Sequence, residues 1–140
     1  MPCWMLIITS IGFFIPSIFA ARLKRSKDTK MIQALATTSI LYHGTVHPLA
    51  QFVDTCVAHF VAFRYMIHGA VHLIHHRTIQ NTIAMTIGSI SAFMYYFKSQ
   101  QIEDVNESRK WHAYVHVSAQ MALIMFLHSP KRYAITYEEI

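Results

Sequence analysis

Residues Ser39 to Asp54 read SILYHGTVHPLAQFVD, and the interpretation of the whole chain starts from this stretch. It lies in apolar sequence but carries a serine, two histidines and an aspartate. Six of the seven acidic residues fall in polar segments, whereas Asp54 lies among Leu, Phe, Val and Cys. An ionisable group at membrane depth is costly unless it is paired, bound to an ion or hydrated, so Asp54 indicates a functional site. The alternative is an aspartate at the membrane surface that caps a helix.

The composition is that of a membrane protein. The chain has 140 residues, of which 54% are hydrophobic and 14% charged, whereas a typical soluble domain is roughly 25% charged. Four or five apolar stretches approach the ~20 residues that span a bilayer. We therefore predict an all-α polytopic bundle that forms one transmembrane domain. The expected spans cover approximately residues 3–21, 31–47, 48–66, 78–97 and 111–127.

Prolines and polar patches set the expected boundaries of these spans. Pro16 should kink the first span, which carries no candidate ligand, and Pro48 separates the second span from the third. The third span is followed by a polar, turn-like patch at residues 68–77. The fourth is rich in small residues that favour helix packing and has no catalytic group. Residues 98–110 are polar and are predicted to form a loop.

The basic residues predict the orientation. The net charge of +5 is concentrated in the run Arg22–Lys30, which is typical of a cytoplasmic loop on anionic headgroups and not of a nucleic-acid site. With five spans, three basic residues fall on one side, namely Lys98, Arg109 and Lys110. Nine fall on the other: Arg22, Lys24, Arg25, Lys27, Lys30, Arg64, Arg77, Lys131 and Arg132. The N-terminus is thus expected outside or in a lumen, and the C-terminus in the cytoplasm.

This topology predicts that polar residues from three spans meet near the outer face. Ser39 and His43 are four residues apart and share one face of the second span, with His43 near its outer end. Asp54 lies near the outer start of the third span. His112 and His116 lie in the first turns of the fifth. These groups should converge in the outer third of the bundle.

The predicted constellation is typical of a catalytic zinc site, which has three imidazole ligands and one open position. His112 and His116, spaced i and i+4, can face one ion, and His43 would reach it from a neighbouring helix. Asp54 would orient the zinc-bound water or take its proton, and Ser39 would help to hold a substrate carbonyl. The alternative is that these histidines only form hydrogen bonds between helices.

The same residues resemble the motifs of a known group. A Ser-x3-His pair, an Asp eleven residues after the His and a distant His-x3-His resemble the CREST superfamily of membrane hydrolases, which includes alkaline ceramidases and adiponectin-receptor-like proteins. The matching positions are Ser39, Tyr42, His43, Thr45, Gln51, Asp54 and the pair His112 and His116. The matched motifs cover roughly thirty residues of the chain.

The resemblance implies a zinc ion held by His43, His112 and His116, with Asp54 acting on the attacking water and Ser39 beside it. It further implies hydrolysis of the amide bond of a ceramide-like lipid at a site open to the lumen. The chain departs from the family in two respects. The family has seven helices, whereas five are expected here, and no acidic residue precedes Asp28 to match the calcium-associated motif of ceramidases.

Other readings of the histidines predict other cofactors. The spacing His68-x3-His72-x2-His75-His76 is similar to the histidine boxes of membrane di-iron desaturases and hydroxylases. That cluster begins fourteen residues after Asp54, about 21 Å along a helix, so we expect it in a headgroup-facing loop at the opposite membrane face. A bis-histidine haem protein and an accessory subunit of a larger membrane assembly are further alternatives. Metal analysis distinguishes the four hypotheses: the hydrolase predicts zinc, the desaturase-like enzyme non-haem iron, the bis-histidine protein haem, and the accessory subunit no metal.

Overall fold

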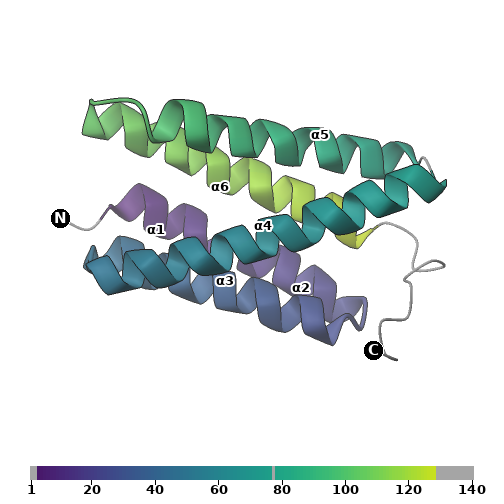
Figure 1. The fold of residues 1–140 in the computed structure, drawn as a ribbon. Coiled ribbons are helices and arrows are strands. Elements are labelled where there is room, and N and C mark those ends of the chain that lie inside the picture. The colour runs from purple at the N-terminus through teal and green to yellow at the C-terminus, as the bar shows by residue number, and fades with distance from the viewer. Residues whose placement is uncertain (1–2, 77, 129–140) are drawn as a thin grey trace.

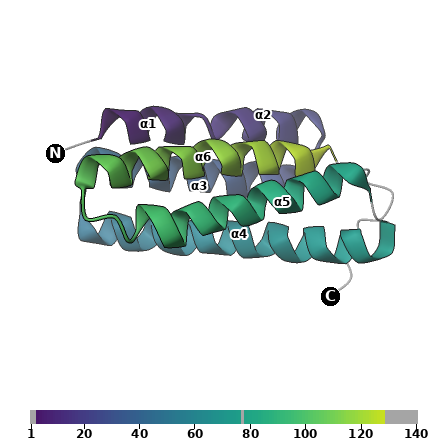
Figure 2. The same ribbon diagram turned by 90° about the horizontal axis from the view of Figure 1, so that it is seen from above.

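The computed structural model describes residues 3–76 and 78–128, and every regular element in these ranges is helical. The elements are α1 (Trp4–Ile11), α2 (Phe14–Arg22), α3 (Ser26–Thr45), α4 (Pro48–His76), α5 (Ile79–Met94), the π-helical segment η1 (Tyr95–Ser99) and α6 (Val105–Leu127). The predicted all-α class is confirmed. The helices lie lengthwise along one bundle axis, with α1 and α2 in line and packed on α3 and α6 (Figure 1, Figure 2).

The first apolar segment is broken between α1 and α2, one turn before Pro16. Proline has no N–H, and its ring crowds the carbonyl four residues earlier, which belongs here to Gly12. The Phe13 N–H donates to a carbonyl three residues back and so leaves the Thr9 carbonyl without its helical donor. Gln120 of α6 donates its Nε2–H to that carbonyl at 2.6 Å. The predicted kink is therefore present, and α6 satisfies the carbonyl that it exposes.

The turn between α3 and α4 is short and strained. Val46 follows Thr45 in the left-handed region with φ of 54°, which a β-branched residue rarely adopts. Two residues later Pro48 occupies the first position of α4, where its missing N–H costs no hydrogen bond. This tight reversal places His43 and Asp54 on adjacent antiparallel helices at the same end of the bundle.

Helix α4 is longer than the sequence predicted. The third span was expected to end near residue 66 and to be followed by a turn, but α4 continues to His76. Gly69 is the only glycine in this stretch, and one glycine in a helix costs only about 1 kcal/mol. Its carbonyl accepts a hydrogen bond from the Asn81 side chain at 2.6 Å, and Met85 and Phe126 pack over it. Tertiary packing therefore maintains the helix, and the predicted turn at 68–77 is wrong for residues 68–76.

The N-terminus of α6 lies inside the segment 98–110 that was predicted to be a loop. Asp104 is the N-cap, and its Oδ1 accepts the backbone N–H groups of Asn106 at 2.8 Å and Glu107 at 2.9 Å. The N–H groups of Glu107 and Asn106 hold the pKa of the Asp104 carboxyl below its ordinary value. Asp followed three residues later by Glu is a capping pattern. The helix therefore begins about two turns before Trp111.

The molecule buries many polar side chains beside its hydrophobic core and exposes many large apolar ones. Ten polar side chains are buried in the described residues: Ser10, Ser17, Ser39, His43, Asp54, His72, Asn81, Ser91, Ser99 and His116. Large apolar side chains are exposed on every α-helix, with Trp4 73% and Phe63 68% exposed. Two stretches, Trp4–Arg22 and Pro48–His75, are long and apolar enough to cross a membrane.

We predict that the Gly69→Ala variant is less stable than the wild type and that Gly44→Ala is not. A Cβ at position 69 would lie 2.5 Å from Cε1 of Phe126, so α4, α5 and α6 would have to separate. A Cβ at position 44 meets no atom within 4 Å, and alanine favours a helix over glycine by about 1 kcal/mol. Thermal unfolding of both variants in detergent measures the difference. An equal change in melting temperature for the two variants would contradict the packing described here.

Candidate metal centre

Three buried or half-buried imidazoles meet at the end of the bundle where α3 ends and α6 begins. They belong to His43 of α3 and to His112 and His116 of α6. Each offers one ring nitrogen, and these nitrogens all lie within 4.8 Å of one another. The ring centroids are 4.9–5.3 Å apart. The structure thus brings together the three histidines that the sequence predicted to converge.

A hydrogen bond assigns the tautomer of His116. Its Nδ1 lies 2.9 Å from the Thr9 hydroxyl, which itself donates to the Leu6 carbonyl at 3.1 Å. Because the single hydroxyl proton is used in that bond, Thr9 accepts the Nδ1–H of His116. The Nε2 atom of His116 then carries a lone pair, as a metal ligand requires.

The other two histidines present the same nitrogen. Nδ1 of His112 lies 3.3 Å from the Ser99 hydroxyl, which donates to the Ser108 carbonyl at 3.4 Å and so accepts the Nδ1–H. Nε2 of His43 is buried and has no hydrogen-bond partner in the described part of the chain. A buried polar nitrogen without a partner is costly. Hydrogen bonding thus leaves Nε2 of His112 and His116 with a lone pair, and Nε2 of His43 is buried without a partner.

This donor set fits zinc. Zinc binds imidazole nitrogens at about 2.0–2.1 Å, so three such ligands in tetrahedral geometry lie about 3.4 Å apart. The 4.8 Å separation in the structure allows one ion to be reached with ring movements of about 1 Å. The hydroxyl partners on the opposite ring nitrogens are the orienting contacts that metal-binding histidines commonly have.

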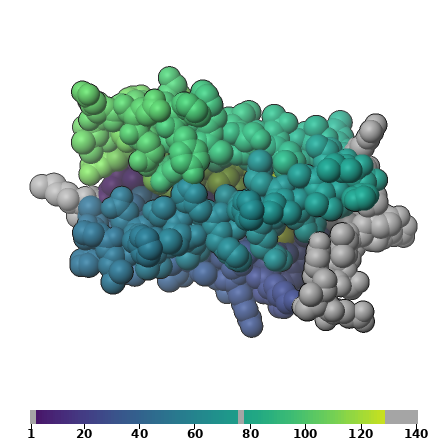
Figure 3. Space-filling view, in the orientation of Figure 1, coloured from purple at the N-terminus to yellow at the C-terminus, as the bar shows by residue number. Residues whose placement is uncertain are grey.

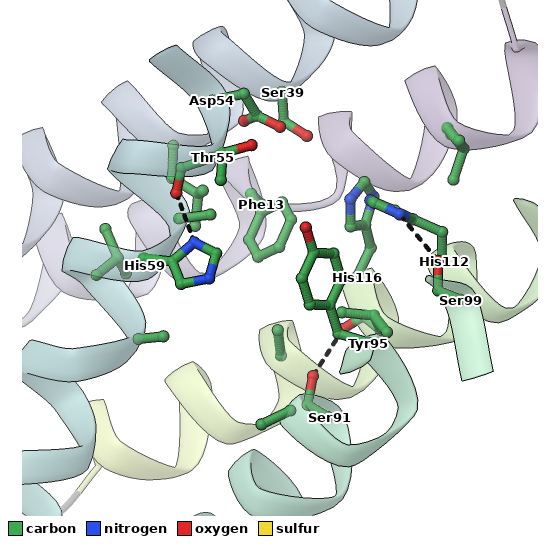
Figure 4. Close-up of a pocket in the computed structure, with 18 of the residues that line it drawn as sticks. Phe13, Ser39, Asp54, Thr55, His59, Ser91, Tyr95, Ser99, His112 and His116 are labelled. Atoms are coloured by element: carbon green, nitrogen blue, oxygen red, sulfur yellow. Dashed lines mark hydrogen bonds between the residues drawn. The ribbon is translucent and has the colours of Figure 1, made fainter. Parts of the chain in front are cut away.

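Asp54 and Ser39 lie beside each other across the cavity from His112 and His116 (Figure 4). Oδ1 of Asp54 accepts a hydrogen bond from Thr38 at 3.1 Å. The Ser39 hydroxyl is 3.0 Å from the hydroxyl of Ser10, which is 3.5 Å from Nδ1 of His116. Both predicted catalytic side chains are thus buried in the same site as the histidines, and Ser10 links Ser39 to the triad.

The site is the polar end of a cavity of about 520 Å³. From the histidines the cavity runs along the bundle axis to an apolar end at Leu123 and Phe126 of α6. A hollow between α4 and α5 opens it to the side, and α1 and α6 are visible through this gap (Figure 3). A hydrogen bond crosses the gap at 2.5 Å: the hydroxyl of Tyr96 in η1 donates to Nε2 of His59 in α4, because Nδ1 of His59 donates to the Thr55 carbonyl at 2.7 Å.

Several residues of the site were missed by the sequence analysis. The first segment was expected to carry no functional group, yet Thr9 and Ser10 contact His116. The sequence feature that could have identified them is a pair of adjacent hydroxyl residues in the middle of an apolar segment. The fourth span was likewise expected to lack site residues, although Tyr95, just beyond α5, packs edge-on against His112 with ring centroids 5.7 Å apart.

The second histidine cluster lies away from this site. His68 and His72 stack with ring centroids 6.4 Å apart in the C-terminal half of α4, whereas the triad lies beside its N-terminal half. Among the side chains that the structure describes, His43, His112 and His116 form the one group of three potential ligands close enough to share an ion. A single di-iron centre built from both histidine sets therefore has no support in this arrangement.

Comparisons of the chain with known protein families, with curated proteins and with solved structures gave no match. The resemblance to the CREST superfamily thus rests on the spacing of Ser39, His43, Asp54, His112 and His116. The geometry described above is a separate observation on the same residues. It is the basis for interpreting the site.

We predict that Thr9→Val lowers zinc affinity about 10–100-fold, because His116 loses the group that orients its ring. Thr86→Val is the matched control, since the Thr86 hydroxyl donates only to the Thr82 carbonyl of its own helix, at 2.9 Å on the surface. Competition with a chromophoric chelator measures both affinities on purified protein. Equal affinities for the two variants would show that Thr9 does not support a metal ligand.

Proposed function

We propose that this protein is a zinc-dependent integral-membrane hydrolase that cleaves an amide-linked lipid. The observation that carries the proposal is the convergence of one ring nitrogen from each of His43, His112 and His116 within 4.8 Å, in a cavity that also holds Asp54. The cavity combines a polar end with an apolar length, as a lipid substrate requires. Its side opening between α4 and α5 would give access from the bilayer.

The distribution of side chains supports membrane insertion, for which we propose five spans. Helices α1 and α2 act together as one span, and α3, α4, α5 and α6 supply four more. An exterior with large apolar side chains on every α-helix, combined with several buried polar groups, is unusual in a soluble monomer and fits a lipid environment. The basic residues of 22–30 lie at the end opposite the histidine triad. The N-terminus and the metal site would then lie on the outer or lumenal side, and the end of α6 on the cytoplasmic side.

The residues of the site have complementary roles in hydrolysis. A bound zinc would polarise the amide carbonyl and make water a stronger nucleophile. Asp54, held by Thr38, would accept a proton from the attacking water and deliver it to the amide nitrogen as the C–N bond breaks. Rotation of the Ser39 hydroxyl away from Ser10 would direct its proton to the carbonyl oxygen. The products are a fatty acid and an amine.

The apolar end of the cavity would hold the acyl chain. It extends from His116 to Phe126, ten residues along α6, which is about 15 Å at 1.5 Å per residue. The walls include Leu35, Val61 and Ala122, which are buried apolar residues of three different helices. Transfer of each methylene of an acyl chain into such a site contributes about 0.8 kcal/mol. The cavity therefore favours long-chain lipid amides over short soluble ones.

We predict that Asp54→Asn leaves zinc content nearly unchanged and lowers hydrolysis of a fluorescent N-acyl lipid by about 10²–10⁴-fold. Asparagine keeps the size of the side chain and removes the charge that accepts the proton. His116→Ala is the control, since it should lose zinc as well as activity. Zinc stoichiometry and turnover are measured on the same preparations. A 10–100-fold fall in zinc affinity in Asp54→Asn would instead make Asp54 a support for the ligands.

Wild-type protein that binds zinc and hydrolyses none of a broad panel of lipid amides would contradict the hydrolase proposal. The protein would then be an accessory subunit of a larger membrane assembly with a structural metal.

The topology is tested with single cysteines at positions 24 and 101 in a variant whose Cys3 and Cys56 are replaced by serine. We expect a membrane-impermeant maleimide to label position 101 from outside and position 24 only after the membrane is opened, because three spans separate them. Labelling of both positions from the same side would contradict the five-span arrangement.

A further inference from the structure

The polar end of the cavity contains a single basic side chain. Of the lysines and arginines in the described residues, only Arg109 lines the cavity, and Asp54 is its only carboxylate. Arg109 precedes His112 by three residues and His116 by seven, so all three lie on one face of α6. Its side chain is half-buried. The guanidinium therefore belongs to the wall of the proposed active site.

The acidic residues nearest to Arg109 in the sequence are engaged elsewhere. Glu107 pairs with Lys110 at 3.2 Å, and Oδ1 of Asp104 accepts the two backbone N–H groups of the helix cap. No ion pair of Arg109 is formed within residues 3–76 and 78–128. A guanidinium at a cavity wall without a carboxylate partner is a binding group for an anion, since its planar fork matches carboxylate and phosphate oxygens.

Arg109 also lies where it could contact the amine half of a bound lipid amide. It is one helical turn outward from His112, a rise of about 4.5 Å along the axis. The apolar end of the cavity lies on the opposite side of the triad, toward Phe126. A lipid amide with its acyl chain in the apolar end and its carbonyl at the triad would direct its amine half toward Arg109.

We propose that Arg109 makes the enzyme selective for lipid amides whose amine half carries an anionic group, a carboxylate or a phosphate, close to the amide nitrogen. This inference rests on the proposed function and specifies its substrate class. The guanidinium pairs with the anion and holds the amide in register with the metal site and Asp54. A substrate with a neutral amine half lacks this contact and leaves Arg109 without a partner.

The test uses two matched pairs of substrates on zinc-loaded protein in nanodiscs, with oleate release followed by mass spectrometry. N-oleoylglycine is compared with N-oleoylglycinamide, and the phosphate ester of N-oleoylethanolamine with N-oleoylethanolamine itself. We expect kcat/KM of the wild type to be about 10–100-fold higher for the anionic member of at least one pair, the usual effect of a charged hydrogen bond. The pair that shows the preference identifies the anion as carboxylate or phosphate.

Arg109→Gln should bring the ratio of kcat/KM between the anionic and the neutral member of each pair close to one. Lys110→Gln is the matched control, because Lys110 is the adjacent cation on α6, is exposed and does not line the cavity. It should retain the preference. Equal loss for neutral and anionic substrates in Arg109→Gln, or the same loss of preference in Lys110→Gln, would overturn the inference.

Equilibrium binding of the same lipids to zinc-free protein separates this inference from the proposed function. Tighter binding of the anionic members to the wild type, lost in Arg109→Gln, supports the role of Arg109 even if no lipid is hydrolysed, and in that case only the hydrolase proposal fails. Hydrolysis without any preference for the anionic members, in turnover or in binding, overturns the inference and leaves the hydrolase proposal intact.

Discussion

The contact between the imidazoles and the hydroxyls of α1 and η1 is the interaction on which the site depends. His43 and His116 are buried, so their ring nitrogens need partners within the bundle. Thr9 and Ser99 each take up one Nδ1–H, from His116 and His112, which leaves the opposite nitrogens with lone pairs for a metal. Polar groups buried in a membrane bundle need such partners, and here the partners also select the ring nitrogen that faces the cavity.

The break between α1 and α2 connects this site to the fold. Pro16 prevents a continuous helix, and the carbonyl that the break exposes on Thr9 is bonded by Gln120 of α6. The absence of a side chain at Gly12 allows this approach, because a Cβ there would lie 2.5 Å from the Gln120 amide oxygen. The same residue, Thr9, thus anchors α1 to α6 through its backbone and orients His116 through its hydroxyl.

The two ends of the cavity differ in polarity because histidines and Asp54 line one end and Leu123 and Phe126 the other. Where α4 ends and α5 begins, the two helices are held by Asn81 and the packing over Gly69. Toward the opposite end of the bundle, the hydrogen bond between His59 and Tyr96 crosses the gap between α4 and η1. An apolar pocket with convergent polar groups at one end is the usual form of a small-molecule site. In a membrane, this one would face lipid through its open side.

The sequence by itself determined the helical class and the level of each functional group along the bundle. The rise per residue and the positions of turns such as Pro48 fix how far His43, Asp54, His112 and His116 lie from the ends of their helices, so their common level follows without a structure. The start of α6 at the Asp104 cap was not predicted, since the polar residues 98–110 were expected to form a loop. The rotation of each helix about its own axis does not follow from the sequence, because it depends on packing between residues that are distant in the sequence. Only the tertiary structure therefore decided that Thr9 and Ser99 hold the imidazoles and that α4 continues to His76.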